Sequence, residues 1–267
     1  MPAMARTIPS ALAPVVELLE LEQPITVTAQ QLREFVESSG VDTPAHVVVQ
    51  RLAERGWLLR TGVRGVWEFA PAAHAGPYPH GDPLLTLRAT LQLHPELPVA
   101  VALSSALWQL DISARRPEVL EIAVPSGTRV PTALRRAYRV VRHTPRLPLR
   151  IVAGLPVHSP PSVLVHLAQR PTDVRNWADV LDHLSDLVVA SGPDEVEIEL
   201  RDRPHSTAVR LAYLLSGVAP DLVERLGVEP RGKVWFGPRG RLRRHSARWN
   251  LADTVLPYAP SELGGDQ

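Results

Sequence analysis

The chain has 267 residues, of which 45% are hydrophobic, so it can build one or two domains around a buried core. It contains no cysteine, which excludes disulfide bonds and cysteine-ligated zinc, and its net charge of +1 excludes a broadly basic surface. No apolar run reaches the length of a membrane span and residues 1–10 lack the apolar stretch of a secretion signal, so we expect a cytoplasmic protein.

The first predicted elements are two helices separated by a short strand. Apolar residues recur at helical spacing over residues 9–21, which predicts the first helix. A β-branched run at residues 25–27 then predicts a small strand. Thr28 and Gln31 have the spacing of a capping box, so the second helix should begin there and end near residue 38.

A third helix is predicted after a short turn. Thr43 would be its N-cap, Pro44 its first residue, and Arg55 would lie close to its end. Val48 and Leu52 lie four residues apart, so we expect both to pack inward. The opposite side of this helix would then face solvent.

A β-hairpin is predicted next, from strand-like runs at residues 57–60 and 66–69 that flank a glycine-containing turn. The order helix, short strand, helix, turn, helix, hairpin is that of a winged helix-turn-helix. In this architecture the third helix enters the major groove of DNA, while the wing reaches the backbone or the minor groove. The sequence therefore predicts a DNA-binding domain over residues 1–71.

Several side chains of this domain are candidates for contacts with duplex DNA. Gln50 and Arg51 are best placed to read bases, because Gln pairs with adenine and Arg with guanine through two hydrogen bonds. Backbone N–H groups at the start of the second helix and arginines of the wing can contact phosphates. The full set is Thr28, Gln30, Thr43, His46, Val47, Gln50, Arg51, Arg60 and Arg64. A protein-docking module remains an alternative, because the third helix is only modestly polar.

A linker rich in Pro, Gly, Ala and His is predicted over residues 72–82, and a larger α/β domain over residues 83–267. The fold class is therefore mixed α/β. Strands are expected at residues 99–103, 119–124, 138–143, 149–152, 234–236 and 251–256. Helices are expected at residues 84–93, 104–108, 162–169, 173–189, 207–215 and 220–226, and residues 196–200 fit either a strand or a helix start.

No motif for nucleotide binding, acyl transfer or metal-dependent hydrolysis occurs in this second region. The ten histidines are scattered and do not have the spacing of metal ligands. One helix carries a carboxylate and imidazole group that we interpret as a solvated face: Asp179, Asp182, His183 and Asp186. We therefore expect no enzymatic activity, no catalytic residue, no metal site and no cofactor.

The densest basic run of the chain lies at residues 238–248. Its arginines are Arg239, Arg241, Arg243, Arg244 and Arg248. Three interpretations stay open for this run: contacts with DNA phosphates, contacts with an acidic partner, or a solvated loop before a final strand.

Four features together suggest a family. They are the winged helix at residues 27–69, the Pro-rich junction, the segment PVAVALSSALWQLDI at residues 98–112, and the late segments HSTAVRLAYLLSG and ARWNLADTVLP. In this layout the chain resembles the AbiEi-type antitoxins of abortive-infection (type IV) toxin–antitoxin systems. The resemblance extends over nearly the full chain.

The resemblance implies a DNA-binding antitoxin that is not an enzyme. Its winged helix would bind inverted repeats in its own promoter and repress the operon, and its second domain would neutralise a cognate nucleotidyltransferase-like toxin, directly or indirectly. Two alternatives remain open: a one-component transcriptional regulator whose second domain senses a small ligand, and a nuclease with a winged-helix targeting module. A nucleotidyltransferase-like neighbouring gene would favour the antitoxin, and a metabolic operon the regulator.

Overall fold

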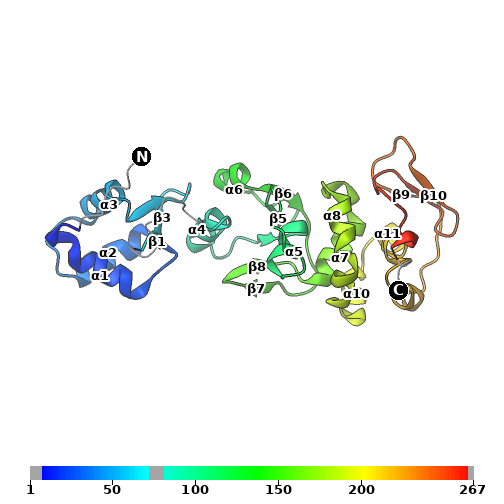
Figure 1. Ribbon diagram of the computed structural model, residues 1–267, viewed down its shortest axis with the longest axis horizontal. Coiled ribbons are helices and arrows are strands. Elements are labelled where there is room, and N and C mark those ends of the chain that lie inside the picture. The colour runs from blue at the N-terminus through cyan, green and yellow to red at the C-terminus, as the bar shows by residue number, and fades with distance from the viewer. Residues whose placement is uncertain (1–7, 72–80, 264–267) are drawn as a thin grey trace. The chain divides into compact units, whose positions relative to one another are not determined.

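The computed structural model describes residues 8–71 and 81–263, which fold into two compact units (Figure 1). The first unit contains the described residues up to Leu97 together with residues 131–137. The second contains residues 98–130 and the described residues from Tyr138 onward. Within the described parts of the chain, no helix is both long enough and apolar enough to cross a membrane.

The first unit has the helices and strands of a winged helix in the predicted order. Its elements are η1 Ser10–Leu12, α1 Ala13–Glu22, β1 Thr26–Thr28, α2 Ala29–Ser38, α3 Ala45–Glu54, β2 Leu58–Arg60, β3 Val66–Phe69, α4 Leu85–Leu93 and α6 Thr132–Ala137. The strands form an antiparallel sheet in the order β1-β3-β2. Helices α1, α2 and α3 bury Leu19, Leu32 and Leu52 in one apolar cluster with the sheet.

The predicted capping box at the start of α2 is confirmed. The backbone N–H of Gln31 donates to Oγ1 of Thr28 over 3.1 Å, and the backbone N–H of Thr28 donates to Oε1 of Gln31 over 2.9 Å. Both donors would otherwise be orphaned at a helix end. The box fixes the position at which β1 turns into α2.

The predicted start of α3 is wrong by one residue. Pro44, not Thr43, precedes the first helical residue, and its φ of −54° and ψ of 136° are extended rather than helical. Its carbonyl oxygen accepts hydrogen bonds from the backbone N–H groups of Val47 and Val48 at 2.9 and 3.2 Å. Proline can take this last extended position without loss because it has no N–H to satisfy.

Helix α4 packs within the first unit, against β1 and β3. Nε2 of Gln92 donates to Oε1 of Gln31 over 2.8 Å, and Oγ1 of Thr86 donates to the carbonyl oxygen of Thr61 over 3.0 Å. The compact unit is thus larger than the predicted residues 1–71. Most of the predicted linker lies outside the described residues, and the functional division of the chain at that linker stays a prediction.

The second unit contains a mixed five-stranded sheet in the order β6-β5-β4-β8-β7. The strands are β4 Ala100–Val101, β5 Glu121–Val124, β6 Arg139–Arg142, β7 Arg150–Val152 and β8 Leu155–Val157. β4 pairs in parallel with β8, and β5 with β6, while the other two pairs are antiparallel. Strand β8 was not predicted, although a two-residue turn with positive φ at Ala153 and Gly154 joins it to β7 as in a tight hairpin.

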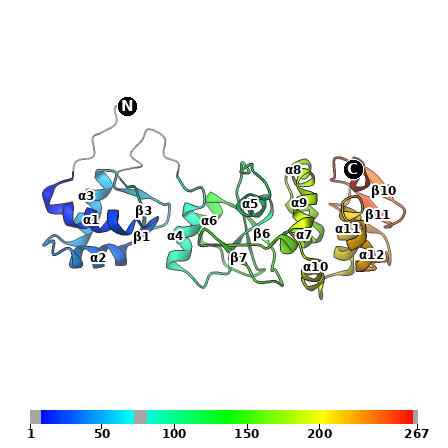
Figure 2. The same ribbon diagram turned by 60° about the horizontal axis from the view of Figure 1, so that its bottom comes forward.

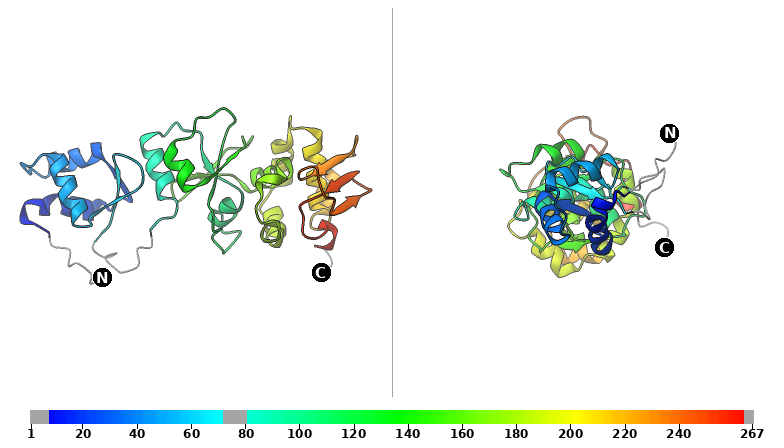
Figure 3. Two further views of the ribbon diagram at one scale, coloured as in Figure 1. Left: turned by 90° about the horizontal axis from the view of Figure 1, so that it is seen from above. Right: turned by 90° about the vertical axis from the view of Figure 1, so that its left-hand side faces the viewer.

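Helix α7 is central to the helical part of this unit, and residues 160–168 within it are all buried. It contacts α5, α9, α10 and α11 (Figure 2). The helices are α5 Leu103–Gln109, α7 Pro160–Gln169, η3 Pro171–Asp173, α8 Trp177–Asp182, α9 Leu184–Val189, α10 Pro193–Leu200, α11 His205–Leu215, α12 Pro220–Leu226 and η4 Pro260–Glu262. A second sheet, β10-β11-β9, follows α12 and comprises β9 Val234–Phe236, β10 Arg244–Ser246 and β11 Leu251–Asp253 (Figure 3).

The mixed α/β fold class is confirmed, and several boundaries need correction. The single helix predicted over residues 173–189 is in fact η3, α8 and α9. Asn176 starts α8 by accepting the N–H of Asp179, and His183, with φ −107° and ψ 6°, interrupts the helix before α9. Residues 196–200 belong to helix α10, not to a strand.

Candidate functional site

Helix α3 presents one polar face to solvent. Val48 and Leu52 are fully buried on its inner side, four residues apart as expected. His46, Gln50 and Arg51 are exposed on its outer side. The remaining two candidates, Thr43 before the helix and Val47 on its flank, are half-buried. The buried side of α3 and the exposure of His46, Gln50 and Arg51 agree with the expectation, whereas Thr43 and Val47 are less exposed than expected.

The wing is a β2–β3 hairpin whose tip is held by one buried threonine. Oγ1 of Thr61 donates to the carbonyl oxygen of Val66 over 2.9 Å and accepts the N–H of Val63 over 3.2 Å. Arg60 and Arg64 are both exposed on this hairpin. Arg64 thus lies on a tip whose own hydrogen bonds hold it in place, and Arg60 lies at the base of the hairpin, at the end of β2.

A groove of about 610 Å³ lies between α3 and β2. His46, Gln50 and Arg60 line it, so the fold brings together predicted contact residues that are up to fourteen positions apart in the sequence. Its other lining residues are Val49, Ala53, Glu54, Leu58, Leu59 and Trp67. The negative charge of the Glu54 carboxylate partly offsets the positive charge of Arg60 in this groove.

The start of α2 offers fewer backbone donors than the sequence suggested. The N–H groups of Thr28 and Gln31 are used in the capping box, and that of Ala29 donates to the carbonyl oxygen of Gly65 over 2.9 Å. The predicted phosphate contact at this helix end therefore depends on Gln30. Its side-chain amide is exposed and donates to Oε1 of Glu34 over 2.8 Å.

Gln50 has a comparable intrahelical partner. Its Nε2 donates to Oε1 of Glu54 over 2.9 Å, on the exposed surface of α3. Pairs of this kind on an exposed helix contribute only about 0.2–0.5 kcal/mol. Gln50 can therefore exchange Glu54 for a base edge at little cost.

The arginine-rich run of residues 238–248 lies in the second unit and divides into two groups. Arg243 and Arg244 donate to the carbonyl oxygen of Leu256, and Arg244 also pairs with Asp253 at 3.1 Å, so both fasten β10 to the segment after β11. The other three arginines, Arg239, Arg241 and Arg248, are exposed. A phosphate or partner contact by the run stays a prediction, and these three residues are the ones available for it.

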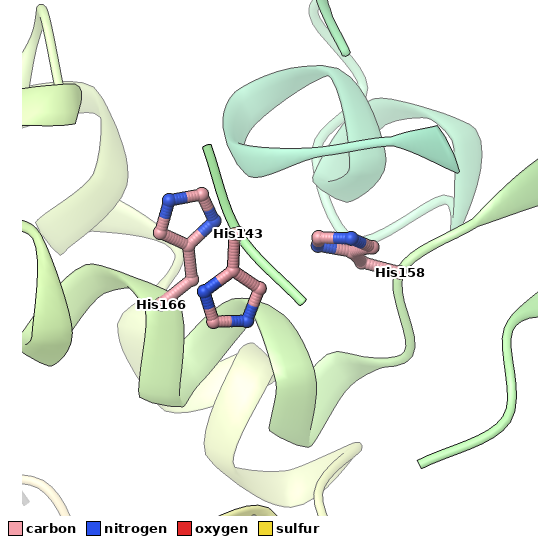
Figure 4. Close-up of side chains that lie close together, drawn as sticks. All are labelled: His143, His158 and His166. Carbon is pink, nitrogen blue, oxygen red and sulfur yellow. The ribbon is translucent and has the colours of Figure 1, made fainter. Parts of the chain in front are cut away.

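A cluster of three buried histidines is the feature that sequence reasoning missed. His143 follows β6, His158 follows β8, and His166 lies in α7 (Figure 4). One potential ligand nitrogen of each lies within 4.8 Å of those of the other two. Sequence spacing gave no signal, because three separate elements bring these rings together. By contrast, Asp179, Asp182, His183 and Asp186 are not part of any such cluster among the described residues.

Residues 99–217 match the family model of the AbiEi antitoxin C-terminal domain. This range contains all five strands of the larger sheet and the helices from α5 to α11. No curated protein sequence matches the chain. The crystal structure of the RV2827C protein from Mycobacterium tuberculosis is similar to it, with 28% sequence identity and a TM-score of 0.80 over 96% of this chain and 95% of that chain.

Proposed function

Residues 99–217 belong to the AbiEi antitoxin C-terminal domain family, and on this basis we propose that the chain is a DNA-binding antitoxin. The first unit binds inverted repeats in the promoter of its own operon and represses transcription. The second unit neutralises a cognate nucleotidyltransferase-like toxin, through direct contact or indirectly. The family is one of antitoxins rather than enzymes, so the proposal assigns no catalytic step to the chain.

The observation that most supports DNA binding is the groove between α3 and the wing. Gln50 and Arg60 both line it, so a duplex whose major groove receives α3 would also meet the wing. Arg51 on α3 and Arg64 in the turn of the wing are also exposed. The two arginines of the wing supply phosphate contacts, and Gln50 and Arg51 read bases.

An operator with two inverted half-sites requires two such surfaces. Each copy of the chain carries one α3 and one wing among its described residues. Two copies therefore occupy one operator, whether they dimerise in solution or only on DNA.

Fluorescence anisotropy of the full-length protein tests the DNA-binding part. The duplex upstream of its own gene is compared with a scrambled duplex across a salt series. We expect a preference for the native duplex that persists at physiological salt. Equal and steeply salt-dependent binding to both duplexes would mean charge attraction alone. Complete absence of binding would make the winged helix a protein-docking module and contradict the autorepression proposal.

Toxin rescue tests the second part separately. The neighbouring toxin gene is expressed with wild-type chain, with Arg51→Ala, or without the antitoxin, and growth is followed. We expect wild type and Arg51→Ala to restore growth equally, since Arg51 lies outside residues 99–217. Growth arrest that persists with wild-type chain would contradict the neutralisation proposal without affecting the DNA-binding one.

A further inference from the structure

The backbone fixes the positions of the three clustered histidines in the second unit. The N–H of His143 donates to the carbonyl oxygen of Val124 over 3.2 Å, and the N–H of His158 to that of Val101 over 3.0 Å. Both residues thus continue the strand pairing just past β6 and β8. His166 lies on the buried helix α7. The side chains of His143 and His166 are fully inaccessible to solvent.

The three rings lie close together but leave nitrogen atoms unsatisfied. The rings of His143 and His166 are stacked, with centroids 4.1 Å apart and planes within 7°, and the ring of His158 is tilted beside them at 5.3 Å from His143 (Figure 4). Nδ1 of all three is buried without a hydrogen-bond partner among the described residues. Such groups are uncommon in folded proteins and cost about 1–3 kcal/mol each, so a cluster of three needs an explanation.

Two carboxylates lie near Nε2 of His166 and of His143. Oδ2 of Asp173 is 3.2 Å from Nε2 of His166. Oε1 of Glu199 is 3.8 Å from Nε2 of His143, and hydrogen bonds from the backbone N–H groups of Arg146 and Leu147 hold that carboxylate in place. Metal-binding histidines typically place a carboxylate on the ring nitrogen that does not ligate the metal. Asp173 occupies Nε2 of His166, which leaves Nδ1 of that ring for a ligand, whereas both ring nitrogens of His143 lack a hydrogen-bond partner among the described residues.

Burial lowers the pKa of all three histidines, and for His166 the value is about 4. The neighbouring Asp173 and Glu199 oppose this effect, while Arg170 and Arg203 reinforce it.

We propose that His143, His158 and His166 form a binding site for a zinc ion that ties the ends of β6 and β8 to helix α7. Three imidazole nitrogens are a common zinc ligand set, and a water molecule takes the fourth position. Zinc–nitrogen distances of about 2.0–2.1 Å place tetrahedral ligands roughly 3.3 Å apart. Zinc binding must therefore draw the ligand atoms inward from their present spacing of up to 4.8 Å and separate the stacked rings.

The burial of the cluster makes this zinc structural. It links three elements within residues 99–217 and leaves α3 and the wing untouched. The proposal does not depend on the assignment of the chain as a DNA-binding antitoxin. It concerns the folding stability of the second unit.

Metal content and thermal stability of the full-length protein, prepared without a polyhistidine tag, provide the test. The protein is stripped with a chelator, then titrated with Zn²⁺, and with Mg²⁺ as a control cation. We expect one equivalent of zinc to bind and to raise the melting temperature by roughly 5 °C or more, with no effect of Mg²⁺. Co²⁺ in place of zinc should show the visible absorption of a tetrahedral site.

Matched variants locate the effect. His158→Gln should abolish the zinc-dependent shift, whereas His94→Gln, at an exposed histidine of the first unit, should keep it. Asp173→Asn retains all three ligands and should weaken zinc binding roughly 10-fold or more while the protein stays folded.

Two results would overturn the proposal. One is a wild-type protein that takes up no zinc and shows no shift, which would make the cluster a neutral packing of histidines. The other is a shift that persists in both His158→Gln and Asp173→Asn, which would place the metal elsewhere. If His158→Gln fails to fold, the Co²⁺ spectrum of the wild type and the Asp173→Asn titration decide whether the histidine cluster binds the metal.

Discussion

At the scale of single residues, Glu199 is a fully buried charge of the second unit with several hydrogen-bond partners. Its carboxylate accepts hydrogen bonds from the backbone N–H groups of Arg146 and Leu147 at 2.9 and 3.0 Å and from Oγ of Ser162 at 3.0 Å. It also pairs with Arg203 one helical turn away. A buried charge is tolerated only when it is compensated in this way. Glu199 therefore fastens helix α10 to α7 and to the segment before β7.

The first prediction concerns this carboxylate. Glu199→Gln removes the negative charge and leaves the buried Arg203 without its ion-pair partner, so we expect the free energy of unfolding to fall by about 3–5 kcal/mol. Denaturant unfolding followed by circular dichroism measures it. Glu195→Gln, at an exposed position of the same helix, is the control and should change stability by no more than about 0.5 kcal/mol. Equal stability of the two variants would contradict the assigned role of Glu199.

The pH dependence of the stability difference between wild type and Glu199→Gln follows from the pKa of Glu199. Burial alone would raise this pKa, but the nearby His143, the backbone donors and Arg203 together lower it from 4.5 to about 2. A carboxylate with a lowered pKa stabilises the fold above its unfolded value and loses that effect as pH falls. The gap between wild type and Glu199→Gln should therefore be full at neutral pH and shrink below about pH 4.5.

The second prediction concerns Arg51 on α3. If Arg51 reads a base, Arg51→Ala should weaken binding to the native duplex by about 1–3 kcal/mol and weaken binding to a scrambled duplex much less. Anisotropy on both duplexes measures the two losses. Arg33→Ala on α2, another exposed arginine of the same unit, serves as the matched control. Equal losses on both duplexes would show that Arg51 contacts only the backbone.

At the scale of elements, a close backbone contact at the end of a helix holds part of the second unit together. Helix α11 ends at Leu215, and Gly217 lies just beyond it against the 3₁₀ helix η4. A Cβ atom at Gly217 would lie only 2.0 Å from the carbonyl oxygen of Pro260. The close approach of these two backbones requires glycine at this position, and it fastens the last described helix to α11.

The third prediction follows from that contact. Gly217→Ala forces η4 away from α11, because the neighbouring atom is backbone and cannot rotate aside, so we expect a loss of roughly 1–3 kcal/mol in stability. Gly240→Ala is the control, since a Cβ atom at Gly240 would meet no described atom within 4 Å, and it should shift stability by less than about 1 kcal/mol. Thermal unfolding compares the two. A melting temperature for Gly217→Ala equal to that of wild type would mean that η4 does not dock there.

At the scale of the whole molecule, the position of the boundary between the two units determines which fragment of the first unit is stable by itself. Helix α4 lies beyond the predicted linker, yet it packs on β1 and β3 and donates hydrogen bonds to Gln31 and Thr61. Its Leu87 is fully buried. A fragment that ends before α4 therefore exposes apolar surface and loses polar contacts.

The fourth prediction compares two fragments. Residues 1–71 and residues 1–97 should both bind the native duplex, because both contain α3 and the wing. The longer fragment should unfold at a higher denaturant concentration, since it keeps the packing of α4. Anisotropy and denaturant unfolding check these expectations. A folded 1–97 fragment that does not bind DNA would mean that the second unit supplies essential contacts or dimerisation.

The local features of this protein could be predicted from its sequence. The amphipathic pattern of α2 and α3, the capping box at Thr28 and Gln31, and the glycine-containing wing turn all depend on residues within a few positions of one another. The order of these elements was enough to predict the winged helix and the exposed face of α3. The family resemblance likewise depends on short, continuous segments of the sequence.

Long-range contacts were decided only by the tertiary structure. Strand β8 has a proline at its centre, Pro156, which argues against a strand when the sequence is considered alone. The break at His183 depends on local backbone angles that an apolar pattern does not encode. The histidines at 143, 158 and 166 have no motif, because a strand end, a second strand end and a buried helix bring them together. Sequence spacing reports neighbours along the chain, whereas packing of the sheet against α7 determines which distant side chains share one buried space.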